Sequence, residues 1–176
     1  MTVVKPNYFD PIQQKTAKRW QQLEADHDLA APWHQLFKQG QSPRHVLSEL
    51  LQNADDAEAT EVSVRIENGI FSFIHNGKDF TEDFASLCRF GYSNKRLLRT
   101  IGFRGIGFKS TFSLGDTVVL RSPTLIVAFH KRQFTLPIWS DGETTKDGTT
   151  QIIVKIQDDQ RKKELVNNIQ EWLSSP

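Results

Sequence analysis

"SPRHVLSELLQNADDAEATEVSVRIENGIFSFIHNG", residues 42–77, is a stretch whose hydrophobic period changes halfway along. In its first half, apolar residues recur at helical spacing, and Ser42 and Pro43 suit the cap and the first position of a helix. The apolar stripe consists of Val46, Leu47, Leu50, Leu51 and Ala54. We therefore predict a helix that begins at Pro43 and buries this stripe.

The second half of the stretch predicts a strand hairpin. Val62, Val64 and Ile66 alternate with polar residues, and Asn68-Gly69 is a dipeptide that accepts the positive φ angles of a tight turn. Two antiparallel strands are expected on either side of that turn. A helix followed by a hairpin favours an α+β fold over a parallel α/β fold.

The flanking sequence extends this pattern. Helices are expected over residues 11–31, over a short run after Thr81 and over 160–173; strands are expected at 117–120, 124–130, 133–138 and 149–157. The predicted fold class is a two-layer α+β sandwich, in which a mixed, mostly antiparallel sheet is backed by helices. We expect one domain, with residues 1–40 as a helical extension, 41–157 as the core and 158–176 as a closing helix. The ending "SSP" suggests the N-terminal piece of a longer protein.

Charge and cysteine content narrow the class of protein. Lys and Arg total 22 and Asp and Glu total 21, so the net charge of +1 gives no bulk reason to expect nucleic acid as a partner. The single cysteine, Cys88, excludes an internal disulfide and is expected to be a packed core thiol. No apolar run approaches the roughly 20 residues of a membrane span, so we expect a cytoplasmic protein without a membrane partner.

The glycine-rich segment "TIGFRGIGFKSTF", residues 100–112, has several interpretations. Its glycine spacing reverses that of the dinucleotide-binding motif, and Phe108 separates Gly107 from Lys109, which breaks the phosphate-loop motif. No apolar span surrounds it, so a membrane pairing face is excluded. A plain turn and an anion-binding loop before a helix near Gly107 both remain open.

The polar face of the helix after Ser42 favours the anion-binding interpretation. Glu49, Gln52, Asn53 and Asp56 lie at i, i+3, i+4 and i+7, and so share one face. The Asn53 amide offers an oxygen ligand to Mg²⁺, and Glu49 can orient and deprotonate a water molecule. A solvated polar face is the alternative.

Together these motifs resemble the GHKL-type ATPases, which include gyrase, the ninety-kilodalton heat-shock chaperones, sensor histidine kinases and mismatch-repair proteins. "ELLQNADDA", residues 49–57, resembles their first motif, and "IGFRGIGFKS", residues 101–110, resembles their glycine motif. The residues of these motifs are most similar to those of the sacsin-like branch. "DGTTQIIV", residues 147–154, is similar to the strand that closes their pocket.

The resemblance implies ATP and Mg²⁺ as cofactors, with Glu49 as the general base and Asn53 as the magnesium ligand. It implies a phosphate loop shaped by Gly102, Gly105 and Gly107, a lid that starts at Ser93, Asn94 and Lys95, and a base contact from Thr149. Further candidate contacts to the nucleotide are Asp56, Asn76, Gly77, Arg104, Ile106, Phe108 and Lys109.

One departure from the family concerns the base. The family's Asp-x-Gly-x-Gly motif uses its aspartate to accept a hydrogen bond from the adenine amino group. Here His75 stands at that position and Asp79 replaces the second glycine. Asn76 or Asp79 are the candidate replacements, together with His75 itself.

Three functions stay open at this point. The first is Mg²⁺-dependent ATP hydrolysis that drives conformational change in attached domains of a chaperone-like or defence-type protein, with a nucleotide-dependent dimer possible. The second is a nucleotide-binding interaction module without turnover. The third is a nucleic-acid-binding module that uses the basic segment 89–109, which contains no acidic residue.

Overall fold

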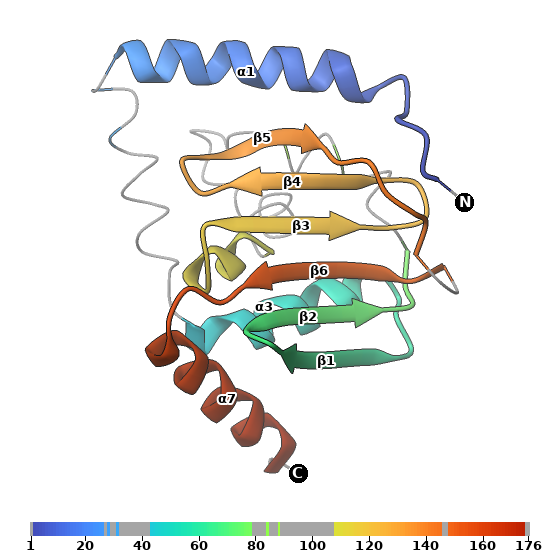
Figure 1. Ribbon diagram of the computed structural model, residues 1–176, viewed down its shortest axis with the longest axis vertical. Coiled ribbons are helices and arrows are strands. Elements are labelled where there is room, and N and C mark those ends of the chain that lie inside the picture. The colour runs from blue at the N-terminus through green and yellow to red at the C-terminus, as the bar shows by residue number, and fades with distance from the viewer. Residues whose placement is uncertain are drawn as a thin grey trace.

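The computed structural model describes residues 2–26, 28, 31, 43–78, 84, 88, 108–145 and 148–174. The helical elements whose bounds lie within these residues are α1 (Phe9–Ala25), α3 (Pro43–Asp56), the 3-10 helix η1 (Phe108–Ser113) and α7 (Asp159–Ser174). The strands are β1 (Val62–Glu67), β2 (Ile70–His75), β3 (Thr117–Arg121), β4 (Ile126–His130), β5 (Gln133–Trp139) and β6 (Thr150–Lys155). They form one sheet in the order β1-β2-β6-β3-β4-β5 (Figure 1).

The sheet confirms the predicted fold class. Each of its five strand pairings is antiparallel, and α3 passes behind β6 and β2 in Figure 1. The predicted turn joins β1 to β2, with φ of 53° at Asn68 and 74° at Gly69. The last strand, β6, lies between this hairpin and the β3–β4–β5 meander, so the pairing that completes the sheet is long-range in sequence. The proposed division into an extension, a core and a closing helix stays a prediction.

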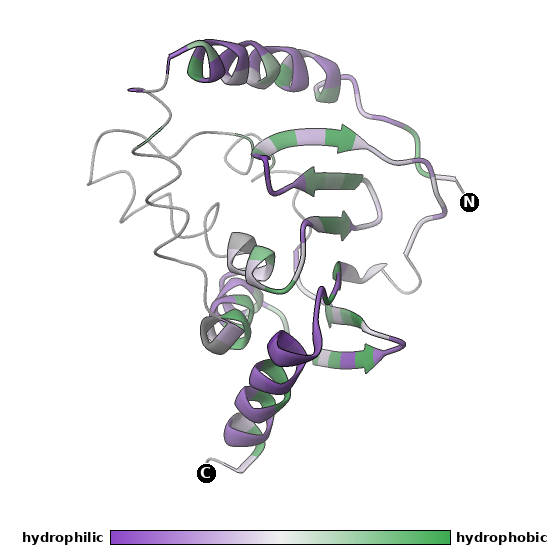
Figure 2. Ribbon diagram, turned by 60° about the vertical axis from the view of Figure 1, so that its left-hand side comes forward, coloured by the Kyte–Doolittle hydropathy of each residue, from purple (hydrophilic) through white to green (hydrophobic). Residues whose placement is uncertain are grey.

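The core lies on one face of the sheet. Register places Phe71 beside Val154 and Phe73 beside Ile152, and all four side chains are buried. Helix α3 contributes four members of the predicted stripe to the same core, namely Val46, Leu47, Leu50 and Ala54. In Figure 2, β3 and β4 are largely hydrophobic, whereas α1 and α7 are mostly hydrophilic. Because each buried aromatic or aliphatic side chain contributes about 1.5–3 kcal/mol, this core is the main stabilising term.

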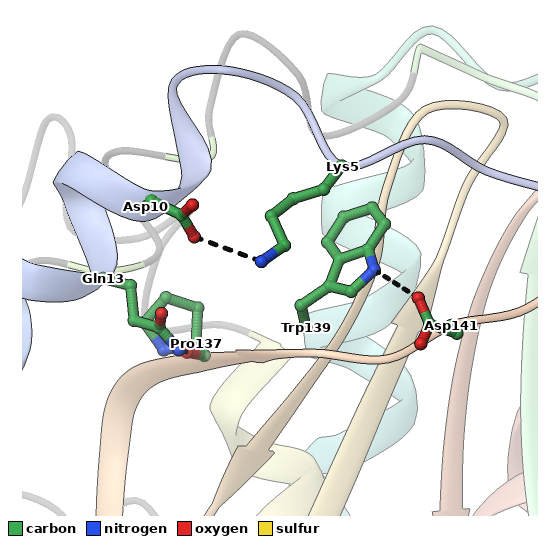
Figure 3. Close-up of polar contacts among 6 residues, drawn as sticks. All are labelled: Lys5, Asp10, Gln13, Pro137, Trp139 and Asp141. Atoms are coloured by element: carbon green, nitrogen blue, oxygen red, sulfur yellow. Dashed lines mark hydrogen bonds and ion pairs between the residues drawn. The ribbon is translucent and has the colours of Figure 1, made fainter.

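Helix α1 covers the edge strand β5. The Trp20 indole N–H donates a hydrogen bond of 2.8 Å to the Thr135 hydroxyl. The Gln13 amide donates one of 2.8 Å to the Pro137 carbonyl, and Figure 3 shows these two residues side by side. Pro137 has no N–H to offer a neighbouring strand, which suits an edge position. A helix over this edge also protects it from pairing with another chain.

The predicted bounds of the first helix, residues 11–31, are wrong. Helix α1 begins at Phe9 and ends at Ala25, because Asp26 has extended backbone angles and its carboxylate accepts the Asp28 N–H at 3.0 Å. Such a contact favours a chain turn over a continued helix. On this helix Thr16 is buried, with its hydroxyl 2.8 Å from the Ile12 carbonyl and 3.2 Å from the Cys88 carbonyl, whereas the Ile12 side chain is only partly buried. Cys88 is buried, as predicted.

The C-terminal end of α3 adopts a left-handed closing turn without glycine. The Glu58 N–H donates to the Asp55 carbonyl at 2.9 Å and the Ala59 N–H to the Ala54 carbonyl at 2.9 Å, which is the Schellman pattern. Glycine normally occupies the left-handed position, but here Glu58 does, with φ of 61°.

This turn generates a stability prediction. Glu58→Gly should exceed Glu58→Ala in free energy of unfolding by about 1 kcal/mol, because only glycine relieves the positive φ. Both variants lose the exposed 3.3 Å ion pair with Lys78, so the comparison cancels that contribution. Urea denaturation of the two variants measures the difference, and equal midpoints with equal slopes would contradict the prediction.

Candidate functional site

The predicted polar face of α3 borders the core. Glu49, Asn53 and Asp56 are half-buried and Gln52 is exposed, with the Gln52 amide 3.3 Å from the Asp56 carboxylate. Asn53 follows Leu50 by one turn, so its amide lies at the boundary between the buried stripe and the polar face. Its Nδ2 is buried and has no hydrogen-bond partner within the described residues. Such an atom needs an explanation, because an unpaired buried donor costs about 1–3 kcal/mol.

The end of β2 buries a histidine. His75 is only 3% exposed and follows Phe71 and Phe73 on the core-facing side of the strand. Its Nδ1 accepts the backbone N–H of Gly77 at 3.0 Å. Burial lowers the pKa of His75 below its ordinary 6.5, since a charged ring would be poorly solvated there. The ring is therefore neutral near pH 7.

A threonine of β6 stands directly opposite this histidine. Register pairs His75 with Thr150, which is fully buried and whose Oγ1 has no partner among the described residues. Thr149, the residue predicted to contact the base, is half-buried just before the strand, and its carbonyl accepts the Thr145 hydroxyl at 2.5 Å. Thr150 was missed by sequence reasoning, because only the strand register distinguishes the two adjacent threonines.

The turn after β2 is attached to the end of α3. The Lys78 N–H donates to the Ala57 carbonyl at 2.8 Å, and a Cβ on Gly77 would lie 2.5 Å from that carbonyl oxygen. This position therefore requires glycine. The contact places His75 and Thr150 at the same end of the sheet as the last turns of α3, which carry Asn53.

Asn76 has a different environment from its neighbours. Its side-chain oxygen accepts the N–H groups of Thr60 at 2.8 Å and Glu61 at 3.0 Å, and its amide donates to the Thr60 hydroxyl at 2.7 Å. The carbonyl that sequence reasoning offered to adenine thus bridges the α3–β1 loop to the end of β2.

Two further buried hydroxyls lie on η1, which begins at Phe108, one residue after the predicted helix start. Ser110 and Ser113 are buried, their Oγ atoms have no partner within the described part of the chain, and η1 packs against α3. Neither was named as a candidate contact, although Ser110 is the last residue of the segment that resembles the glycine motif and Ser113 follows it closely. The side chains of Phe108 and Lys109 lie outside the described part of the structure. The remaining predicted contacts also lie outside the described residues, namely Asp79, Ser93, Asn94, Lys95, Gly102, Arg104, Gly105, Ile106 and Gly107.

Metal-binding clusters and membrane-spanning helices are both absent from the described residues. Within them, no group of three or more His, Cys, Asp or Glu side chains is placed to hold a metal ion. None of the helices in this part of the chain combines the length and apolar character that a membrane crossing requires.

Comparison with known proteins gives two partial matches. Residues of this chain are 37% identical over 93 residues to the DNA mismatch repair protein MutL of Staphylococcus carnosus (strain TM300), a match covering 47% of this chain and 14% of MutL. They are 30% identical over 105 residues to human sacsin, covering 48% of this chain and 2% of sacsin. No family model matches.

These matches fall in two groups that the sequence motifs resemble, the mismatch-repair proteins and the sacsin-like branch. They support a relation to GHKL-type, ATP-binding proteins. The chain corresponds to only a small part of either relative, 14% and 2% of their lengths.

The buried histidine predicts a pH-dependent stability. Because its folded pKa lies below 6.5, the unfolded chain takes up a proton at pH values where the folded protein does not. The contribution of neutral His75 to stability is complete above about pH 6.5 and is lost as the pH falls toward the folded pKa. Thermal unfolding between pH 7.5 and 5.5 should therefore show a steeper decrease in Tm for the wild type than for His75→Asn. Parallel curves would contradict this assignment.

Proposed function

We propose that this chain is a nucleotide-binding module that holds a purine nucleoside triphosphate with Mg²⁺ and hydrolyses its terminal phosphate. The observation that carries the proposal is the set of buried, unpartnered polar atoms on α3 and β6, Asn53 Nδ2 and Thr150 Oγ1. A fold built on an apolar core tolerates such atoms where a ligand supplies their partners. The partial similarity to GHKL-type proteins supports the choice of ligand.

The two residues on α3 have complementary chemistry. The Asn53 amide oxygen would hold Mg²⁺, which prefers hard oxygen ligands and usually shares its shell with substrate phosphates and water. Because water and phosphate oxygens fill most of its coordination shell, Mg²⁺ needs only one or two ligands from the protein. Glu49, one turn earlier on the same face, would orient the attacking water and accept its proton. The glycine segment 102–107 would supply backbone N–H groups to the phosphates.

Turnover would serve attached domains of a longer protein. In this proposal, ordering of a lid that begins near Ser93 reports the nucleotide state to those domains, since order and disorder of such segments is a common switch. A nucleotide-dependent dimer is part of the same proposal.

Calorimetry and phosphate release test this function. Mg-ATP should bind to the wild type, Glu49→Ala should retain binding while losing at least about 100-fold in turnover, and Asn53→Ala should lose magnesium-dependent affinity. Asp55→Ala provides a matched control, because Asp55 is an exposed carboxylate on the same helix but outside the Glu49–Asn53 face. Absence of binding by the wild type, or equal effects of Asp55→Ala and Glu49→Ala on turnover, would reject the proposal.

A second candidate is a nucleotide-binding interaction module without turnover. The observation that favours it is His75, which stands where the family's base-binding aspartate is expected. Binding of Mg-ATP without phosphate release, also when further domains of a longer protein are attached, would select this candidate.

A nucleic-acid-binding role for segment 89–109 is the third candidate, and the partial match to a DNA mismatch repair protein is what favours it. The affinity for duplex DNA should then decrease steeply with salt, with roughly one counterion released per phosphate contacted. Affinity that does not change between low and high salt would exclude it.

A further inference from the structure

The hydrogen bond to Gly77 fixes the polarity of the His75 ring. A backbone N–H can only donate, so Nδ1, at 3.0 Å, must be the accepting nitrogen. In a neutral imidazole the proton then resides on Nε2. The free end of the ring is consequently a hydrogen-bond donor, held in place by burial and by a backbone contact within its own turn.

Thr150 gives this donor an adaptable neighbour. Residues directly opposite in an antiparallel pair have Cβ atoms about 4.5–5.5 Å apart, so His75 and Thr150 can contact the same small group. The Thr150 hydroxyl can donate or accept by rotating, and its oxygen is without a partner among the described residues. The pair therefore offers one fixed donor and one group of either polarity.

This polarity is opposite to that of a carboxylate. An ionised aspartate only accepts hydrogen bonds, and so selects a base that presents an amino group. If an adenine amino group faced the His75 Nε2–H, two hydrogen-bond donors would oppose each other. The Nε2–H is suited instead to a ring nitrogen or a carbonyl oxygen of the base, which accept hydrogen bonds. Asn76 does not restore an acceptor, because its carbonyl already accepts the N–H groups of Thr60 and Glu61.

We propose that His75 and Thr150 together read an acceptor on the purine edge, so that the site does not require the 6-amino group of adenine. This inference rests on the proposed function, since it concerns the base of the same bound nucleotide. The acceptor is either a purine ring nitrogen or the carbonyl oxygen at position 6.

Nucleotide analogues test the proposal on the wild-type protein. We would titrate the magnesium complexes of ATP, inosine triphosphate and purine riboside triphosphate, which lacks any substituent at position 6. At least one of the two analogues should bind within about fivefold of ATP, the effect of one neutral hydrogen bond. Preference for the inosine nucleotide identifies the carbonyl as the acceptor, and preference for the purine riboside identifies the ring nitrogen.

Two variants separate base reading from folding. His75→Asp should create dependence on the amino group, with ATP favoured over inosine triphosphate by about tenfold or more. Thr150→Val should weaken binding of every nucleotide about tenfold while leaving Tm unchanged or raised, because it replaces a buried, unpartnered hydroxyl by a methyl group. Thr150→Val remains informative even if His75→Asp prevents folding.

The outcomes distinguish this inference from the function on which it rests. If ATP binds but both analogues bind more than about fivefold more weakly, the amino group is read and the inference is wrong while the proposed function stands. If Thr150→Val binds all nucleotides as the wild type does, Thr150 does not contact the nucleotide, and the inference that His75 and Thr150 read the base together is wrong. If no triphosphate binds to the wild type, both are wrong.

Discussion

The arrangement of the site depends on one close approach between backbone segments. Lys78 N–H meets the Ala57 carbonyl at 2.8 Å, and this is possible only because Gly77 has no Cβ, which would lie 2.5 Å from the same oxygen. The contact joins the end of β2 to the end of α3. It thereby sets the position of His75 relative to the helix that carries Asn53. Hydrogen bonds from the α3–β1 loop to Asn76 stabilise the same junction from the other side.

The other half of the site comes from far along the chain. Strand β6 enters the sheet between β2 and β3 and places Thr150 opposite His75. Gly115 permits this insertion, since a Cβ there would lie 2.1 Å from the Lys155 carbonyl oxygen of β6. Pairings between residues so distant in sequence cost more loop-closure entropy than the pairing within a hairpin does. The helix and hairpin can assemble locally, whereas the complete site requires the whole sheet.

Local features of the sequence were predictable, and non-local ones were not. The period of residues 42–77 predicted α3, its buried stripe and the β1–β2 turn, because these depend on neighbours a few residues away. The end of α1 was not predicted, since a single Asp26 contact stops a helix whose composition would continue. Strand order and register decide that Thr150 faces His75, and periodicity only indicates which face a residue occupies. The roles assigned to the glycine segment stay predictions.

Buried polar atoms without hydrogen-bond partners lower the stability of the folded protein. Asn53, Ser110, Ser113 and Thr150 each bury a polar side-chain atom that has no partner among the described residues. At about 1–3 kcal/mol for each such group, they would reduce a stability that in most domains is only about 5–15 kcal/mol. A ligand that satisfies even two of them recovers part of that loss, and it adds binding energy available only to the folded state. Selection for stability alone would favour apolar side chains at positions such as Thr150. In the proposed function, Asn53 on α3 and Thr150 at the start of β6 are the polar side chains whose partners the nucleotide would supply.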